Sequence, residues 1–192
     1  MQIQYTPMFP SLQSDNHFQI ALNKTSLFTR TMFHTQEGRG IKLTKPIICI
    51  KPNAWLGEAY YFWYDMNHAK DWGIFSKKKT GSYDIYKAEI NCDNILDTVF
   101  NEEHYKFWLD QVEKVAKILL KKTRMKPSIK EINQYFKERS TWDEVTGIMF
   151  QELPSSPGST LIQNFYYKKR IQLAVYKSEI ITNFAHTFSG MC

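Results

Sequence analysis

The sequence predicts a single compact α+β domain, and three observations lead to that prediction. The chain has 192 residues, enough for one substantial hydrophobic core but too few for two domains of ordinary size. Runs rich in β-branched and aromatic residues recur along it, as is typical of strands. Between these runs, a segment that begins at Asn101 has the apolar spacing of an amphipathic helix.

The first 24 residues differ in composition from the rest of the chain. Pro7 and Pro10 stand among scattered Ser, Asn and Gln residues, with only a weak apolar set. This composition predicts an irregular N-terminal arm, residues 1–24, in front of a single domain over residues 25–192.

Three strands are expected in the first half of the domain. Residues 25–34 alternate in a β-rich run that leads to the polar loop 36–40. Residues 46–50 form a short apolar run between two prolines, which predicts a buried strand. Residues 83–90 place Tyr86, Ala88 and Ile90 on one face, as an amphipathic strand does.

A dense aromatic block runs from Trp55 to Asp65. Gly57 stands near its start, and Asp65 is the expected N-cap of a helix over residues 66–73. Trp72 of that helix is expected to pack back against the block. The simplest interpretation is a buried strand followed by a capped helix.

Two further helices are expected in the middle of the chain. Asn101 and the two glutamates after it start the first helix, and Ser128 with Glu131 forms a capping box that starts the second. Both helices are interpreted as scaffold. The basic stretch 117–130 is a rim that can border a polyanion.

The last part of the chain is expected to form two strands joined by a loop. Residues 141–152 predict a strand around Gly147, and the Pro, Ser and Gly residues of 153–160 predict a loop. In the final strand Ile171, Leu173 and Val175 share one face, so Gln172 points the other way.

Composition and charge restrict the partners. The formal charge of +6 and the pI near 9.1 favour anions, whether a dinucleotide, nucleic acid or an acidic partner. Three cysteines without metal-ligand spacing indicate neither a disulfide framework nor a zinc site. The start of the chain does not resemble a signal peptide and no apolar stretch is long enough to span a bilayer, so we expect a cytoplasmic protein without a membrane partner.

Short patterns in the strands resemble the ADP-ribosyltransferases of the His-Tyr-Glu type. Phe33-His34-Thr35 is similar to the family's aromatic-His-Gly-Thr/Ser signature, with Thr35 in the glycine position. The segment from Gly57 to Phe62, followed by Ala69 and Trp72, is similar to the family's Gly-x-Gly-x-Tyr-Phe-Ala setting, with Ala59 in the position of the second glycine. Gln172 stands where the family has its catalytic glutamate.

The resemblance implies a split, mostly antiparallel sheet around an NAD cleft. In that family the histidine holds the adenosine-side ribose, the backbone of the next residue grips the carboxamide, and the tyrosine borders the nicotinamide ring. We therefore expect NAD as a substrate, no metal ion, and five cofactor-binding residues: His34, Thr35, Gly57, Tyr61 and Trp72.

Three residues are the catalytic candidates. Cleavage of the nicotinamide–ribose bond develops positive charge on the ribose. Tyr61 is expected to support the leaving ring, and Gln172 is expected to hold the 2′-hydroxyl without supplying charge. Glu152 is the candidate for that charge or for a general base toward the acceptor; the alternative is an exposed acid at the end of a strand.

The entry to the last strand combines stackable rings with cations. These are the groups with which proteins bind single-stranded nucleic acid. The alternative is that the rings belong to the core and the cations to its rim. The residues concerned are Tyr166, Tyr167, Lys168, Lys169 and Arg170.

The resemblance extends to small effectors of bacterial toxin-antitoxin and phage-defence systems. It implies an NAD-dependent mono-ADP-ribosyltransferase toxin that modifies a nucleic acid, with RNA slightly favoured, and that is neutralised by an antitoxin protein. Two alternatives stay open: the acceptor is a protein side chain, or the chain is a catalytically silent module that binds NAD or RNA. A nuclease finds no support, because no suitable pair of carboxylates or His-Lys arrangement is visible.

Overall fold

The computed structural model describes residues 28–52, 54–139, 142–152 and 170–192. Within these ranges the chain forms a seven-stranded, mostly antiparallel sheet and three α-helices. The predicted mixed α+β class is therefore confirmed. The expected N-terminal arm, residues 1–24, lies outside the described residues.

The strands lie in the spatial order β4-β5-β6-β2-β1-β3-β7. Neighbours are antiparallel except β4 and β5, which run parallel. Their bounds are β1 Thr29–Glu37, β2 Tyr60–Trp63, β3 Ser82–Asn91, β4 Ile95–Asp97, β5 Gly147–Glu152, β6 Arg170–Val175 and β7 Ile181–Met191.

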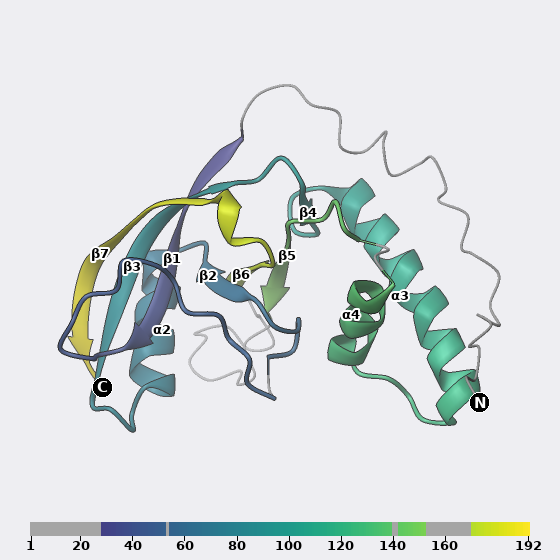
Figure 1. Cartoon of the computed structure of the whole chain (residues 1–192), viewed down its shortest axis with the longest axis horizontal. Helices are drawn as coiled ribbons and strands as arrows, with labels where there is room; N and C mark the ends of the chain where they lie inside the picture. The colour runs from purple at the N-terminus through teal and green to yellow at the C-terminus, as the bar shows by residue number, and fades with distance from the viewer. Residues whose placement is uncertain (1–27, 53, 140–141, 153–169) are drawn as a thin grey trace, which may run out of the picture.

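The sheet consists of two halves that meet at a narrow junction. On one side β1, β3 and β7 form a long ladder, and β1 pairs with β3 from Thr29 to Glu37. On the other side β2, β6, β5 and β4 form a second ladder. Between the halves, the register of β1 and β2 has one pair only, Phe33 with Trp63, and Figure 1 shows the two halves diverging from this region.

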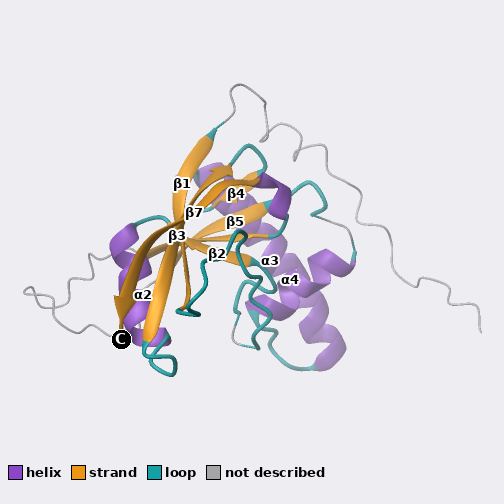
Figure 2. Cartoon of the chain, turned by 60° about the vertical axis from the view of Figure 1, so that its left-hand side comes forward, coloured by secondary structure: helices purple, strands orange, loops and turns teal. Residues whose placement is uncertain are grey.

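Helix α2, Met66–Ser76, follows β2 directly and covers the half of the sheet that holds β1 and β3 (Figure 2). Asp65 caps it as predicted, because its Oδ1 accepts from the backbone N–H of Asn67 at 2.6 Å. Gly73 lies where α2 approaches β3, and a Cβ at this position would meet the Tyr83 ring at 2.3 Å. The absence of a side chain thus permits the close packing of helix and strand.

Helices α3, Glu102–Thr123, and α4, Ile129–Glu138, lie beside the other half of the sheet (Figure 1). The predicted starts are confirmed: Asn101 caps α3, and Ser128 with Glu131 forms the capping box of α4. Their apolar stripes pack against β4 and β5 in one cluster, with these buried members: Leu96, Trp108, Val112, Val115, Ile132, Phe136, Val145 and Ile148.

A second apolar cluster lies on the opposite face of the central strands. Leu173 and Val175 are fully buried there, and Ile171 is nearly so, which confirms the predicted apolar face of β6. Phe62 and Met32 belong to the same cluster. The two clusters together bury both faces of the central strands, as the near-continuous apolar sequence of β6 requires.

One predicted strand is wrong. Residues 46–50 form no strand: Cys49 makes an isolated bridge with Ala59, and Ile48 and Ile50 are 41% and 66% exposed. Pro46 and Pro52 lack the backbone N–H that a ladder needs, so this run does not extend the sheet. It forms part of the connection from β1 to β2 instead.

Two strands were not predicted. β7, Ile181–Met191, pairs with β3 at the edge of the sheet, so the strand that contains Gln172 is not the last. Two irregularities interrupt the register of this ladder, which breaks the alternation by which an edge strand is recognised. β4 has only three residues, too few for a pattern. The strand predicted over 141–152 begins only at Gly147.

Candidate functional site

The junction between the two halves of the sheet brings two predicted site residues together. Past the pair Phe33–Trp63, the imidazole of His34 takes the place of a ladder hydrogen bond: its Nδ1 lies 2.8 Å from the carbonyl oxygen of Tyr61. A carbonyl can only accept, so Nδ1 carries the hydrogen and Nε2 keeps a free lone pair. Residues 27 positions apart in sequence are thereby joined.

His34 is a neutral, buried histidine. Burial lowers its pKa from 6.5 to about 4, while the hydrogen bond to Tyr61 acts in the opposite direction. Its ring lies between Phe62 and Phe184, with centroid distances of 5.3 and 6.0 Å. Its Nε2 is buried and has no hydrogen-bond partner among the described residues. Unpaired buried acceptors of this kind are rare in folded proteins.

The hydroxyl of Tyr61 is engaged by the turn that precedes β2. It donates to the Gly57 carbonyl at 2.8 Å and accepts from the backbone N–H of Leu56 at 3.2 Å. Burial raises the pKa of this phenol. Gly57 has a φ of +91°, the left-handed region that glycine adopts without strain, so this predicted residue shapes the turn that holds the Tyr61 ring.

Gln172 lies beside Glu152 and Arg170. Its Nε2 donates to Glu152 Oε2 at 3.2 Å, and the same carboxylate pairs with the Arg170 guanidinium at 3.2 Å. Gln172 is 6% exposed. The three side chains come from β5 and β6, on which Glu152 pairs with Arg170 and Phe150 pairs with Gln172. Glu152 is therefore a paired acid and not an isolated one.

The sheet separates these residues into two faces. Trp63 is the register partner of Gln172 and Tyr61 that of Ala174, and paired residues lie on the same face. The Tyr61 and Gln172 side chains thus share a face, whereas Phe62, against which His34 packs, points to the other. His34 and Gln172 therefore lie on opposite faces of the sheet.

Two further predicted residues belong to helix α2 and its contact with β1. The Thr35 hydroxyl donates to the Ala69 carbonyl at 2.9 Å, and both residues are buried. Trp72 is 38% exposed, and its ring lies 5.7 Å from that of Trp63. Thr35 therefore anchors α2 on the sheet, while Trp72 leaves a partly exposed ring beside buried Trp63 at the face that carries Gln172.

An ionic cluster near His34 was not predicted from the sequence. Lys77, 9% exposed, donates from Nζ to Glu37 at 3.0 Å, and Arg39 reaches the same carboxylate at 3.7 Å. Burial alone would raise the pKa of Glu37, but the hydrogen bond and charge of Lys77 outweigh it and hold the pKa below its ordinary value. The charges of Lys77 and Glu37 also act on the pKa of His34, in opposite directions.

A pocket of about 250 Å³ opens between α4, the turn at Gly57 and the end of β6. The rings of Phe136 and Trp142, both in its lining, are stacked with centroids 4.0 Å apart. Tyr176 also lines it, and its hydroxyl donates to the Leu56 carbonyl at 3.1 Å. Sequence analysis placed these aromatic residues in the scaffold or in strands, because nothing in their local pattern indicates that they share a cavity.

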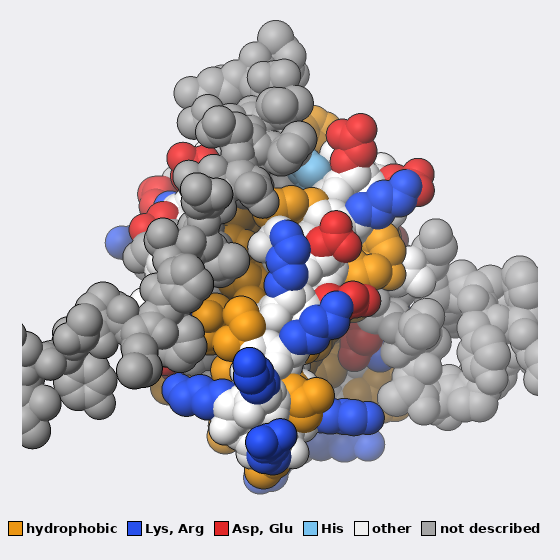
Figure 3. Space-filling view, turned by 90° about the vertical axis from the view of Figure 1, so that its right-hand side faces the viewer, with side chains coloured by type: hydrophobic (Ala, Val, Ile, Leu, Met, Phe, Trp, Pro, Cys, Tyr) orange, Lys and Arg blue, Asp and Glu red, His pale blue; other side chains and the backbone are white. Residues whose placement is uncertain are grey.

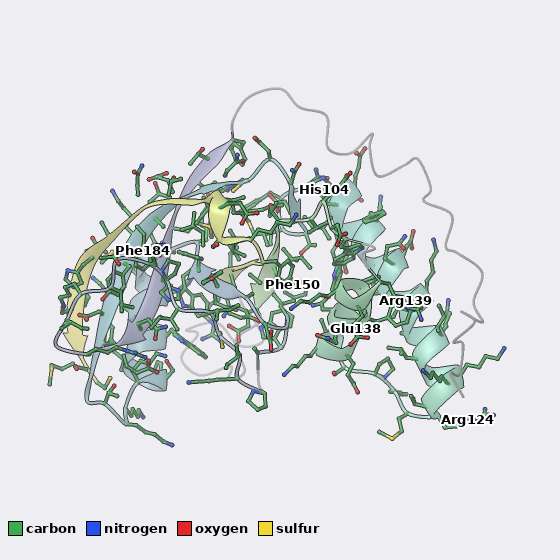
Figure 4. All side chains as sticks on the ribbon, in the orientation of Figure 1. His104, Arg124, Glu138, Arg139, Phe150 and Phe184 are labelled. Atoms are coloured by element: carbon green, nitrogen blue, oxygen red, sulfur yellow. The ribbon has the colours of Figure 1, made fainter. Side chains whose placement is uncertain are left out.

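The remaining predicted residues divide between described and undescribed ranges. Tyr166, Tyr167, Lys168 and Lys169 lie outside the described residues, and Arg170 is paired with Glu152. Figure 4 shows Phe150 on β5 and Phe184 on β7, one on each half of the sheet, with the central strands between them. In the described ranges no group of His, Cys, Asp and Glu has the arrangement of a metal site, and no helix is long and apolar enough to cross a membrane.

Comparisons with protein-family models, with curated proteins and with solved structures found no match for this chain.

Proposed function

We propose that this protein is an NAD-dependent ADP-ribosyltransferase that modifies a nucleic acid, with RNA favoured, and that it acts as a cytoplasmic toxin held in check by a neutralising protein. The observation that carries the proposal is the contact between His34 and Tyr61. The resemblance expects these two residues at one ligand, and the His34 imidazole lies 2.8 Å from the backbone carbonyl oxygen of Tyr61 where the ladder between β1 and β2 ends, although the Tyr61 side chain points to the other face of the sheet.

The chemistry of the surrounding groups supports an NAD site. The unpaired Nε2 of His34 is an acceptor for a ribose hydroxyl. The Lys77 and Arg39 cations near it suit a pyrophosphate, since together they carry one positive charge more than the Glu37 carboxylate neutralises. On the other face, the exposed ring of Trp72, which packs beside buried Trp63, offers a surface for the nicotinamide.

Gln172 is the group proposed to hold the 2′-hydroxyl of the ribose. Its carbonyl oxygen accepts a hydrogen bond as a carboxylate oxygen does, but it adds no charge to stabilise the developing cation. The nearest acid described here, Glu152, is shared with Arg170. We therefore expect slow turnover unless substrate binding releases Glu152 from that pair.

The pairing of Glu152 with Arg170 also favours a second candidate function. If no uncompensated negative charge faces the ribose, the protein binds NAD and consumes none of it, as a catalytically silent module. This candidate differs from the first in one measurable quantity, the rate at which NAD disappears.

The experiment is incubation of the purified chain with adenylate-labelled NAD and separate pools of RNA, single-stranded DNA and cell protein. Tyr61→Ala and Gln172→Ala test the site, and Tyr105→Ala is the matched control because this exposed tyrosine lies on α3, away from both faces of β2. Thermal unfolding of each variant separates lost chemistry from lost structure.

Label on RNA that disappears in Tyr61→Ala and persists in Tyr105→Ala supports the proposal. Label on protein alone changes the acceptor class. Intact NAD in every pool, with saturable NAD binding, replaces the transferase with the silent module.

A further inference from the structure

The pocket at the Gly57 turn is lined by Gly57 but by none of the other NAD-binding residues proposed above. Its lining offers aromatic rings to a flat ligand: Trp142, which stacks on buried Phe136, and Tyr176 are both partly exposed. Stacking on such side chains is how proteins bind unpaired bases.

Two buried polar atoms of the pocket residues lack partners. Asn133 donates from Nδ2 to the Leu56 carbonyl at 3.1 Å, but its Oδ1 has no partner among the described residues. The indole Nε1 of Trp142 is buried and likewise unpaired within the part of the chain that the structure describes. Unpaired buried polar groups are rare in folded proteins. An acceptor and a donor of this kind match a nucleobase, which presents both on its edges.

A row of cations leads away from this pocket. Residues 114–130 contain seven Lys and Arg residues and no Asp or Glu: Lys114, Lys117, Lys121, Lys122, Arg124, Lys126 and Lys130. Figure 3 shows blue side chains gathered on the face formed by α3 and α4, and Figure 4 shows Arg124 at the tip of α3. Cations in the last turn of α3 also stabilise its negative end, but Lys126 and Lys130 lie beyond that helix.

The row continues along α4 to the pocket. Lys130, Gln134 and Lys137 recur at helical spacing and so lie on one side of α4, and Gln134 and Lys137 line the pocket. Lys137 pairs with Glu58 at 3.7 Å, with both side chains more than half exposed. Such an exposed pair contributes little, so a phosphate can replace Glu58 at this lysine.

We propose that the pocket and this row bind single-stranded nucleic acid, with one unstacked base in the aromatic pocket and neighbouring phosphates on Lys130 and Lys137. The inference deepens the proposed function, on which it rests for the nature of the acceptor. It assigns the acceptor strand to α4 and to the Gly57 turn, which also holds the Tyr61 ring.

The test measures binding of a fluorescently labelled ten-nucleotide RNA to the full chain without NAD. Lys130→Gln/Lys137→Gln removes two cations from the row, and Lys79→Gln/Lys106→Gln removes the same charge from the α2–β3 turn and the start of α3. We expect the first pair to weaken binding roughly ten- to thirtyfold at 0.1 M salt and to reduce the slope of log K against log salt by roughly 1.4, as the loss of two phosphate contacts predicts. The control should change binding less than about threefold.

Tryptophan fluorescence reports on the pocket in the same titrations. RNA should quench the wild-type emission, and Trp142→Phe, which retains a ring beside Phe136, should remove most of that quenching. Single-stranded DNA of the same sequence should bind comparably, because stacking and phosphate contacts do not require a 2′-hydroxyl.

The inference is overturned if both double variants weaken RNA binding equally, or if the protein prefers duplex to single-stranded RNA. It is also overturned if NAD competes with RNA for quenching of Trp142. A fourth contrary outcome is that the protein binds anionic vesicles through Lys130 and Lys137 while RNA quenches no fluorescence. NAD consumption by the same preparations is measured separately. RNA binding without NAD consumption rejects the transferase proposal and retains the RNA site. NAD consumption without RNA binding retains the NAD-consuming activity and rejects the RNA site.

Discussion

The imidazole of His34 donates a hydrogen bond to the backbone carbonyl of Tyr61 at the point where the ladder between β1 and β2 ends. A side chain thus replaces a backbone donor across the opening of the sheet. Because the hydrogen on Nδ1 is committed to this bond, the ring must be neutral to keep Nε2 as an acceptor. The state of this one ring links the stability of the junction to its ability to bind a hydroxyl.

The first prediction concerns acid stability. His34 has a folded-state pKa of about 4, below its ordinary 6.5, so the unfolded chain binds more protons between these values. The contribution of neutral His34 to the free energy of unfolding is fully present above pH 6.5. It is lost as the pH falls toward 4, by roughly 3 kcal/mol in total. Urea unfolding at pH 7, 5.5 and 4 measures the loss.

His34→Gln removes the titrating group and should flatten the dependence of the unfolding free energy on pH over that window. Glu37 and Asp84 have lowered pKa values, from ordinary values of 4.5 and 3.8, so they contribute only at the acid end. A slope that persists unchanged in His34→Gln would show that another group controls the junction.

The second prediction concerns the Tyr61 hydroxyl. Tyr61→Phe keeps the ring but leaves the Leu56 N–H and the Gly57 carbonyl without their partner. We expect a loss of about 1–3 kcal/mol in the free energy of unfolding, because a buried polar group that loses its hydrogen-bond partner is no longer compensated for its removal from water. Tyr60→Phe should change stability by less than about 0.5 kcal/mol, since its hydroxyl bonds to none of the described residues. Equal effects of the two substitutions would contradict this account of the turn.

The third prediction concerns the missing charge at the ribose. Gln172→Glu supplies a carboxylate beside the developing cation, and transfer from labelled NAD should rise by about ten- to a hundredfold if Gln172 faces the ribose. Arg170 is close enough to balance the added charge next to Glu152. A rate that stays at the level of Gln172→Ala, in a protein that unfolds at the wild-type temperature, would remove Gln172 from the catalytic set.

The fourth prediction compares two glycines. Gly57→Ala should cost about 1 kcal/mol, because its φ of +91° is unfavourable for alanine although its Cβ would meet nothing within 4 Å. Gly73→Ala should cost more than about 3 kcal/mol, because its Cβ would overlap the Tyr83 ring at 2.3 Å. Thermal unfolding shows which variant is the less stable. A larger loss of stability in Gly57→Ala than in Gly73→Ala would contradict this explanation.

Local physical chemistry was sufficient for the starts of the helices and for the buried strands. Asp65, Asn101 and Ser128 cap helices because each presents a side-chain oxygen to the free N–H groups of the next turn, an interaction between residues a few positions apart. The apolar face of β6 was likewise visible in Ile171, Leu173 and Val175.

The predictions that failed depend on distant partners. Residues 46–50 are as apolar as a strand, but two prolines limit the hydrogen bonds that this run can make to a neighbour, and β7 is recognisable only through the irregular ladder that it forms with β3. Strand formation requires a partner strand, and the sequence of one segment does not reveal where its partner lies.

By itself, the sequence determined the mixed α+β class, the helix caps, the positive charge and the apolar faces, because each of these depends on residues close together along the chain. Only the tertiary structure decided that His34 reaches the Tyr61 carbonyl, that Glu152 is shared by Gln172 and Arg170, and that Phe136, Trp142 and Tyr176 line one pocket. These contacts join residues from different strands and helices, and their energies depend on burial and distance, which exist only after the chain has folded.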